Sequence, residues 1–312
     1  MMKKKEFYFE SRDNHSKVHA VRWLPDDESV KAILVLVHGM AEYIERYEGL
    51  ANYFADRGFL VTGIDNLGHG KSIREDKNPG YFAPVDPATV VVRDVHRLKK
   101  LTQEEYPGIP VAILGHSMGS FIVRNYVIRY GTGIECAVIM GTGEQPGAVL
   151  AGGKAVAGLQ KLFLGDNHIS KLLEGMAFGS YLKRIPNKRT VMDWLSVDEA
   201  NVDKYIADPL CGFTFPVNGF RTLFELIKRC QKSENIDKIP KNLPLLVIAG
   251  KEDPVGNYGK GPESVHKAYK AAGIQDVELV LYDGMRHEIL NEADKERVYG
   301  DIFEFVSSHT CK

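Results

Sequence analysis

The sequence predicts an α/β fold: an eight-stranded, mostly parallel sheet with helices on both faces. Short apolar runs rich in β-branched residues recur along the chain, and those from residue 32 onward are almost continuously hydrophobic. Such runs are typical of strands that are covered on both faces of a parallel sheet. Segments long enough to form helices separate the runs, and this alternation predicts a doubly wound sheet.

The strands are expected where the apolar runs lie. The first two runs predict an antiparallel hairpin that opens the sheet at its N-terminal end, and the later ones predict parallel strands. The eight runs cover residues 7–11, 18–24, 32–39, 59–66, 111–117, 136–143, 245–253 and 277–284.

Helices are predicted between the strands. In the segment 46–58, Leu50, Tyr53, Phe54 and Arg57 recur at a spacing of three or four residues, and Gly58 is expected to end the helix. Similar helical patterns cover residues 89–106, 121–131 and 296–309.

One long stretch interrupts the alternation. Residues 144–230 show no convincing buried strand, but three glycine-spaced amphipathic pieces at 148–165, 168–182 and 191–206. We interpret them as a helical insertion above the carboxyl ends of the strands, where sheets of this kind place their ligands. The chain then divides into a first core part (1–143), a cap or lid (144–230) and a second core part (231–312). The alternative is that these helices are peripheral and take no part in a site.

Composition excludes several classes of protein. The 312 residues are 44% hydrophobic and 26% charged, and 40 basic residues balance 41 acidic ones, so there is no electrostatic argument for a nucleic-acid partner. No apolar stretch approaches the length of a membrane span, and the basic start MMKKK precedes a segment too polar for a signal peptide. The four cysteines have neither zinc-ligand nor disulfide-framework spacing. We therefore expect a cytoplasmic protein with no metal and no cofactor.

The motif GHSMG at positions 115–119 points to a nucleophile. It follows the apolar run VAIL and precedes a helical pattern, so Ser117 is expected on a sharp turn from strand to helix. Such a turn brings neighbouring backbone very close, and side chains at Gly115 and Gly119 would clash there. The alternative, a serine in an ordinary glycine-rich turn, leaves the strand, turn and helix in sequence unexplained.

A serine hydroxyl needs a base, and the base needs an acid that fixes its tautomer. After a nucleophile on this kind of turn, the acid and then the base follow in the chain. Asp253 ends the apolar run 245–253, and His287 follows the next run. Glu252 is a rival acid, but strand alternation directs it away from Asp253, and Asp283 lies too close in sequence to His287.

The negative charge that develops during such a reaction needs two backbone N–H donors. One is expected from Met118, directly after the nucleophile. The other is expected from Met40 in the loop after the run 32–39, where Gly39 allows a close approach of the backbone. His116, inside the nucleophile motif, is expected to pack locally and to take no part in proton transfer.

The segment IDNLGHGKS at 64–72 is a second glycine-rich turn. A phosphate-binding loop requires GxxxxGK[ST], and only GHGKS is present, so nucleotide binding has little support. A structural turn close to the site is the better interpretation.

Four stretches together resemble a known group of enzymes: HGMAEYIERYEGLANYFADRGFLVTGIDNLGHGKS (38–72), GHSMGS (115–120), AGKEDPVG (249–256) and GMRHEILNE (284–292). They are similar to the monoacylglycerol lipase and lysophospholipase group of the α/β-hydrolase superfamily, in particular to its bacterial members. The resemblance implies Ser117 as nucleophile, Asp253 as acid, His287 as base, and Met40 and Met118 as oxyanion donors. It also implies that 144–230 forms a cap around a tunnel for the acyl chain.

The expected activity is hydrolysis of carboxylic esters of lipids, with monoacylglycerol giving a fatty acid and glycerol. The cap is only moderately apolar, since Lys154 and Lys161 interrupt it, so its contact with a membrane or micelle is expected to be transient. A lysophospholipase, a broad carboxylesterase and a non-catalytic binding module on the same fold are alternatives. So is an aminopeptidase of the proline type, which would need an acidic subsite for the substrate amine, drawn from Glu174, Asp193, Asp198 and Glu199.

Overall fold

The computed structural model describes residues 3–26 and 29–311. Within these ranges a single eight-stranded sheet has the order β1-β2-β4-β3-β5-β6-β7-β8. The first strand pairs with β2, and β2 with β4, in antiparallel fashion, and all later pairs are parallel. The strands are β1 (Lys3–Glu10), β2 (Lys17–Leu24), β3 (Ala32–Val37), β4 (Phe59–Ile64), β5 (Val111–His116), β6 (Cys136–Met140), β7 (Leu245–Gly250) and β8 (Val277–Tyr282). The predicted fold class, including the opening hairpin, is confirmed.

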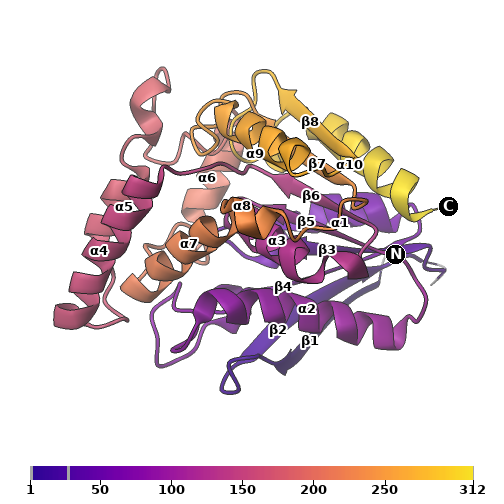
Figure 1. The fold of residues 1–312 in the computed structure, drawn as a ribbon, viewed down its shortest axis with the longest axis horizontal. Helices are drawn as coiled ribbons and strands as arrows, with labels where there is room; N and C mark the ends of the chain where they lie inside the picture. The colour runs from indigo at the N-terminus through magenta and orange to yellow at the C-terminus, as the bar shows by residue number, and fades with distance from the viewer. Residues whose placement is uncertain (1–2, 27–28, 312) are drawn as a thin grey trace.

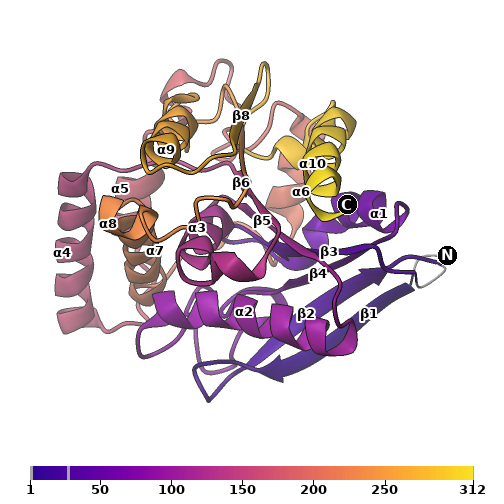
Figure 2. The ribbon, with the colours of Figure 1, turned by 45° about the vertical axis from the view of Figure 1, so that its right-hand side comes forward.

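Helices cover both faces of the sheet. On one face pack α1 (Glu48–Ala55) and α10 (Lys295–Thr310), and on the other α2 (Pro87–Glu105), α3 (Met118–Tyr130) and α9 (Lys260–Ala271) (Figures 1 and 2). Strand β3 shows why every residue of a central strand is apolar. Successive side chains point to opposite faces, so Ile33 and Val35 join one core while Leu34 and Leu36 join the other.

The segment between β6 and β7 is helical and adds no strand to the sheet over residues 141–244, all of which the structure describes. It comprises α4 (Gly147–Leu164), α5 (Lys171–Phe178), α6 (Glu199–Ala207), α7 (Val217–Cys230) and α8 (Ser233–Ile236). Helices α4 and α5 stand at one end of the molecule, away from the sheet, while α7 packs against α2 and α3 (Figure 1). Short 3-10 turns lie at Ile44–Tyr47, Gly70–Ser72, Gly131–Gly133, Tyr181–Arg184 and Ile289–Asn291.

One predicted helical piece is partly wrong. Of the segment 191–206, only Glu199 onward forms a helix, α6, and residues 191–198 form turns. Backbone groups of this segment bond instead to side chains of the loop after β8, for example the Ser196 carbonyl to Arg286 and the Val197 amide to Glu292. Tertiary partners have replaced the helical hydrogen bonds that the amphipathic pattern predicted.

Candidate active site

Ser117 lies on a strained turn between β5 and α3. Its backbone has φ 53° and ψ −120°, a conformation that a side-chain-bearing residue rarely adopts. A Cβ atom on Gly115 would lie 2.3 Å from the Gly119 carbonyl oxygen, and one on Gly119 would lie 2.1 Å from the Val37 carbonyl oxygen. Both glycines are therefore required for β3, β5 and α3 to pack closely enough to present the serine.

Asp253 follows β7 and His287 follows β8, and the two side chains meet. Asp253 Oδ2 lies 2.9 Å from His287 Nδ1, and Asp253 Oδ1 accepts a hydrogen bond from the Val255 amide at 2.8 Å. Both side chains are buried. Because Nδ1–H is committed to Asp253, Nε2 is the ring nitrogen that is left to act as a base. The rival acid Glu252 is exposed.

The proposed oxyanion donors, Met40 and Met118, lie at the same cavity. Met118 begins α3, Met40 follows β3, and both residues line one cavity with Ser117 and His287. Among the described residues, neither amide donates to an acceptor of the chain. A Cβ atom on Gly39 would lie 3.1 Å from the Cβ of Ser117, which shows how closely the Met40 loop approaches the serine.

A buried carboxylate supports this loop. Glu42 accepts hydrogen bonds from the Gly39 amide at 2.6 Å, the Tyr47 hydroxyl at 2.8 Å and Arg46 Nη1 at 2.8 Å. Burial alone would raise the pKa of Glu42, but the hydrogen bond with His116 and the charge of Arg46 hold it below its ordinary value. Glu42 is therefore an anion that fixes the residue next to Met40.

His116 connects the nucleophile turn to the base. Its Nε2 donates to the His287 carbonyl oxygen at 3.1 Å, and its Nδ1 lies 2.9 Å from the Tyr47 hydroxyl and 3.3 Å from Glu42. Burial lowers the pKa of His116, but the hydrogen bond and charge of Glu42 outweigh this and raise it. The predicted local packing is found, and it spans three loops of the site.

A second ion pair joins the Met40 loop to the base loop. Arg46 binds Glu288 through two parallel hydrogen bonds, Nη1 to Oε1 at 2.7 Å and Nη2 to Oε2 at 2.8 Å, and Asn201 of α6 donates to the same carboxylate. Sequence reasoning missed the roles of Glu42, Arg46 and Glu288. All three lie inside the stretches HGMAEYIERY and RHEILNE, which the sequence analysis had already singled out. Within these stretches, roles were assigned only to the residues expected to react or to bind the oxyanion.

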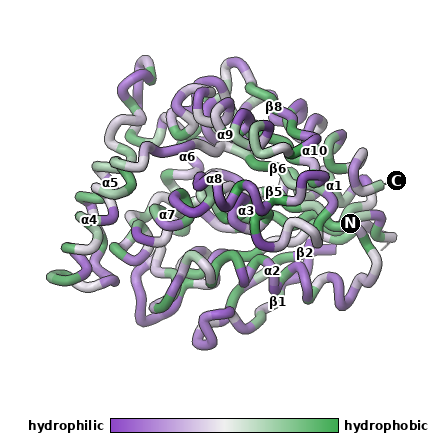
Figure 3. Tube along the Cα trace, in the orientation of Figure 1, coloured by the Kyte–Doolittle hydropathy of each residue, from purple (hydrophilic) through white to green (hydrophobic). Residues whose placement is uncertain are grey.

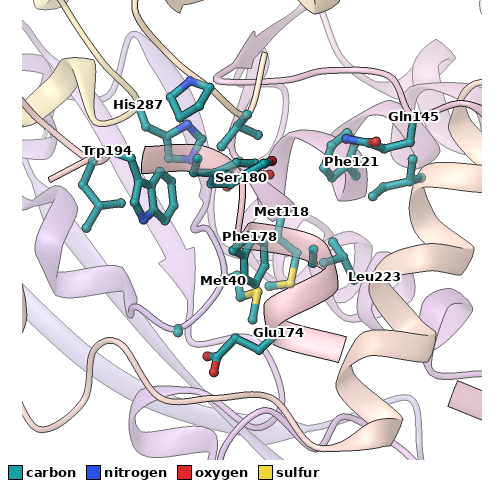
Figure 4. A pocket seen from close by; sticks show the side chains of 18 of the residues that line it. Met40, Met118, Phe121, Gln145, Glu174, Phe178, Ser180, Trp194, Leu223 and His287 are labelled. Carbon is teal, nitrogen blue, oxygen red and sulfur yellow. The ribbon is translucent and has the colours of Figure 1, made fainter. Parts of the chain in front are cut away.

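The cavity above Ser117 has a volume of about 470 Å³ and is mainly apolar. Figure 4 shows Trp194 beside His287, with Met40, Met118 and Phe178 along the wall and Gln145 at another end. Side chains of α4, α5 and α7 contribute Leu150, Phe178, Leu223, Phe224 and Ile227 to the lining. The insertion therefore forms much of the wall that a bound molecule would touch.

The second glycine-rich turn is structural. His69 is fully buried, and its ring lies between 5.3 and 5.4 Å from the rings of Phe82, Phe213 and Phe215. Burial lowers its pKa to about 3, so this imidazole is neutral. The Lys71 amide donates to Asp65, which closes the turn without any ligand.

A serine on a strained turn after β5, with a carboxylate after β7 and a histidine after β8, is the arrangement that is typical of α/β hydrolases. The chain belongs within that class to the family described as serine aminopeptidase, S33, whose model matches residues 28–294. The predicted resemblance and the hydrolase class are thereby confirmed.

The relatives of this chain align with it over almost its whole length. A monoacylglycerol lipase of Mycolicibacterium smegmatis is 29% identical over 92% of this chain and 91% of its own length, and the human monoglyceride lipase is 28% identical over 93% and 86%. A thermostable carboxyl esterase from Bacillus coagulans, solved in complex with glycerol, superimposes with a TM-score of 0.92 at 29% identity, covering 99% of this chain and all of the other. A monoglyceride lipase of Saccharomyces cerevisiae has the same fold, with a TM-score of 0.78 at 21% identity, covering all of this chain and 97% of its own.

Proposed function

We propose that this chain is a serine hydrolase that cleaves carboxylic esters of lipids, with monoacylglycerol as its substrate class. One observation carries the proposal: His287, which is hydrogen-bonded to Asp253 at 2.9 Å, lines the same mainly apolar cavity as Ser117. The lipases and the esterase among its relatives support ester hydrolysis.

The proposed reaction has two halves. His287 Nε2 takes the proton of Ser117 Oγ as the oxygen attacks the ester carbonyl, and the amides of Met40 and Met118 bind the oxyanion. The C–O bond to the alcohol then breaks, and His287 gives the proton to the leaving glycerol. Water, deprotonated by His287, attacks the acyl-serine and releases the fatty acid. Asp253 stays ionised throughout and stabilises the imidazolium.

The charges around the cavity favour a neutral head group. Among the described residues that line it are the carboxylates of Glu42, Glu144, Glu174 and Glu288, and no lysine or arginine. Arg46 already pairs with Glu42 and Glu288, so it is not available to a ligand. A phosphate group would find no guanidinium or ammonium partner in the described lining, whereas glycerol hydroxyls can donate to a carboxylate such as that of Glu174. This supports monoacylglycerol over lysophospholipids, which carry a phosphate.

We propose that residues 144–230 act as a cap and that its outer helices touch the lipid phase transiently. Large apolar side chains on α4 and α5 are exposed, including Leu162, Phe163 and Leu172. Figure 3 shows hydrophobic stretches along the trace of these two helices. Lys154 and Lys161 lie on the same helix, α4, but they pair with Glu225 and Asp166, so the exposed apolar side chains carry the proposed contact. No helix within the described ranges is both long enough and apolar enough to cross a bilayer. The cytoplasm is the proposed location, which the free state of all four cysteines supports.

The aminopeptidase alternative has one specific observation in its favour. Of the four acidic residues predicted as candidates for an amine subsite, Glu174 lines the cavity, and its carboxylate accepts a hydrogen bond from Thr214 at 2.7 Å. Asp193 and Asp198 instead bind nearby donors of the chain, and Glu199 is exposed. The family description also names an aminopeptidase.

A substrate panel tests the proposal. We expect monoacylglycerols to be hydrolysed with a higher kcat/KM than lysophosphatidylcholine, p-nitrophenyl esters or a prolyl amide. Ser117→Ala should fold normally but lose both activity and labelling by a fluorophosphonate. A prolyl amide turned over faster than every ester would replace the proposed substrate class, and labelling retained in Ser117→Ala would refute the nucleophile.

A further inference from the structure

The loop that carries His287 is fastened to the cap segment 193–198. Arg286 Nη1 donates to two backbone carbonyl oxygens, those of Asp193 at 2.6 Å and Ser196 at 2.9 Å. The Glu288 amide donates to the Leu195 carbonyl oxygen at 2.7 Å. The residues immediately before and after the histidine therefore both bond to the same short piece of the cap.

The Glu292 side chain also joins the His287 loop to segment 193–198. Its carboxylate is almost fully buried and accepts from the Ser196 hydroxyl at 2.6 Å and from the amides of Val197 and Asp198 at 3.1 and 3.3 Å. It also accepts from the Arg286 amide at 3.0 Å, which belongs to the base loop. A buried anion with four such donors is held firmly, because losing any of them leaves its charge less compensated.

The fastened segment carries Trp194, which lies against the base. Its ring centroid is 5.3 Å from that of His287, with the planes inclined at 44°, and 5.1 Å from that of Tyr181 (Figure 4). The His287 imidazole is thus held by Asp253 through Nδ1 and by two rings, that of His116 at a centroid distance of 4.6 Å and that of Trp194 from the cap.

We propose that Arg286 and Glu292 are positioning residues: they hold segment 193–198 so that Trp194 fixes the orientation of the His287 imidazole. The inner part of the cap is then a fixed part of the catalytic apparatus, distinct from the outer helices α4 and α5. This inference rests on the proposed function, in which Nε2 must meet Ser117 Oγ. Without Trp194 the ring keeps only Asp253 and His116 as neighbours that orient it, so it turns away from the serine more readily, and a displacement of about 1 Å lowers the rate about 100-fold.

The competing interpretation is that Trp194 is only a wall for the acyl chain. The two interpretations differ for p-nitrophenyl acetate, whose two-carbon acyl group is too short to need that wall. If Trp194 positions the base, Trp194→Ala lowers kcat for this ester by about 10- to 100-fold and slows fluorophosphonate labelling by the same factor. Trp194→Phe, which keeps an aromatic ring on the imidazole, restores most of both.

Arg286→Ala and Glu292→Gln are expected to reproduce the loss in kcat, because alanine removes both hydrogen bonds to segment 193–198 and glutamine lacks the charge. Arg74→Ala and Glu234→Gln are matched controls on exposed ion pairs and should leave kcat unchanged. Rates are divided by the fraction of molecules that the fluorophosphonate finally labels, so partial unfolding does not imitate the effect.

The outcomes separate this inference from the proposed function. Failure of the wild-type Ser117 to react with the probe would overturn the proposed function. A reactive wild type combined with Trp194→Ala at wild-type kcat on p-nitrophenyl acetate, and a raised KM on long-chain monoacylglycerol only, would overturn the positioning role. If Glu292→Gln does not fold, the Trp194→Ala and Trp194→Phe pair still decides the question.

Discussion

Glu42 offers the sharpest test of how the oxyanion loop is built. Its Oε1 accepts from the Gly39 amide and the Tyr47 hydroxyl, and its Oε2 accepts from Arg46 Nη1. Alanine removes these three hydrogen bonds and the 3.3 Å contact with His116 Nδ1, and it leaves the Arg46 charge with one carboxylate partner, Glu288, in place of two. Glutamine keeps an oxygen for Gly39 and Tyr47 but turns an N–H toward the guanidinium.

The expected magnitudes follow from these contacts. Removing one partner of a buried ion pair costs about 3–5 kcal/mol, so Glu42→Ala should lose that much stability. Glu42→Gln should lose about 1.5–3 kcal/mol, the value of one charge-assisted hydrogen bond. Because Gly39 precedes the proposed donor Met40, alanine should also lower kcat/KM by about 100-fold, as loss of an oxyanion donor does. Glutamine keeps the Gly39 contact and should lower it less than about tenfold.

Guanidinium unfolding at pH 7 and p-nitrophenyl butyrate hydrolysis measure the two effects. Glu45→Gln is the control, since this neighbouring carboxylate pairs with Lys4 at the surface and contributes less than about 1 kcal/mol. The folded-state pKa of Glu42 is lowered, so its contribution is present above its ordinary value of 4.5 and is lost as the pH falls below it. The difference in free energy of unfolding between wild type and Glu42→Gln should therefore decrease as the pH falls below 4.5. Glu42→Ala with wild-type kcat/KM would refute the role given to this carboxylate.

Three further predictions concern the acid, the nucleophile turn and a buried carboxyl group. Asp253→Asn should keep the fold but lower kcat about 10⁴-fold, because the catalytic imidazole then takes the wrong tautomer; circular dichroism and steady-state kinetics check this. Gly119→Ala should prevent stable folding, since its Cβ would lie 2.1 Å from the Val37 carbonyl oxygen, whereas Gly158→Ala in open space on α4 should stabilise by about 0.5–1 kcal/mol in thermal unfolding. Burial raises the pKa of Asp94 to about 7, so its protonated form contributes stability below the ordinary pKa, and this contribution is lost as the pH rises toward 7. In Asp94→Asn the free energy of unfolding, measured in urea, should therefore change less with pH between about pH 4 and 7.

Most of the fold was predictable because a strand that is buried on both faces requires a nearly continuous run of apolar residues. The central strands are almost entirely apolar, since both of their faces are covered, and the predicted runs overlap all eight strands. Several runs extend a few residues past the strand ends, as 245–253 does past Gly250, because they include the polar residues that follow the strand and lead to the site. The helix predicted over 191–198 failed for a different reason: the loop after β8 binds its backbone.

The positions of the reacting residues were also predictable, because their spacing reflects a topology. Ser117, Asp253 and His287 each follow a strand of a parallel sheet, and parallel strands bring their carboxyl ends to one edge. Topology therefore predicts which backbone segments lie close together, but it does not predict which side chains form hydrogen bonds between them. The link from Glu42 through His116 to the base loop depends on hydrogen bonds between residues 74 and 171 positions apart.

By itself, then, the sequence determined the sheet, the strained turn at Ser117 and the order in which Asp253 and His287 follow it, since these depend on local periodicity, on glycines and on chain order. Only the tertiary structure decided what surrounds them. It placed Trp194 against His287, buried Glu42 behind Met40 and paired Arg46 with both Glu42 and Glu288. The physical reason is that charge compensation and ring packing depend on distances between residues remote in sequence, and folding sets those distances.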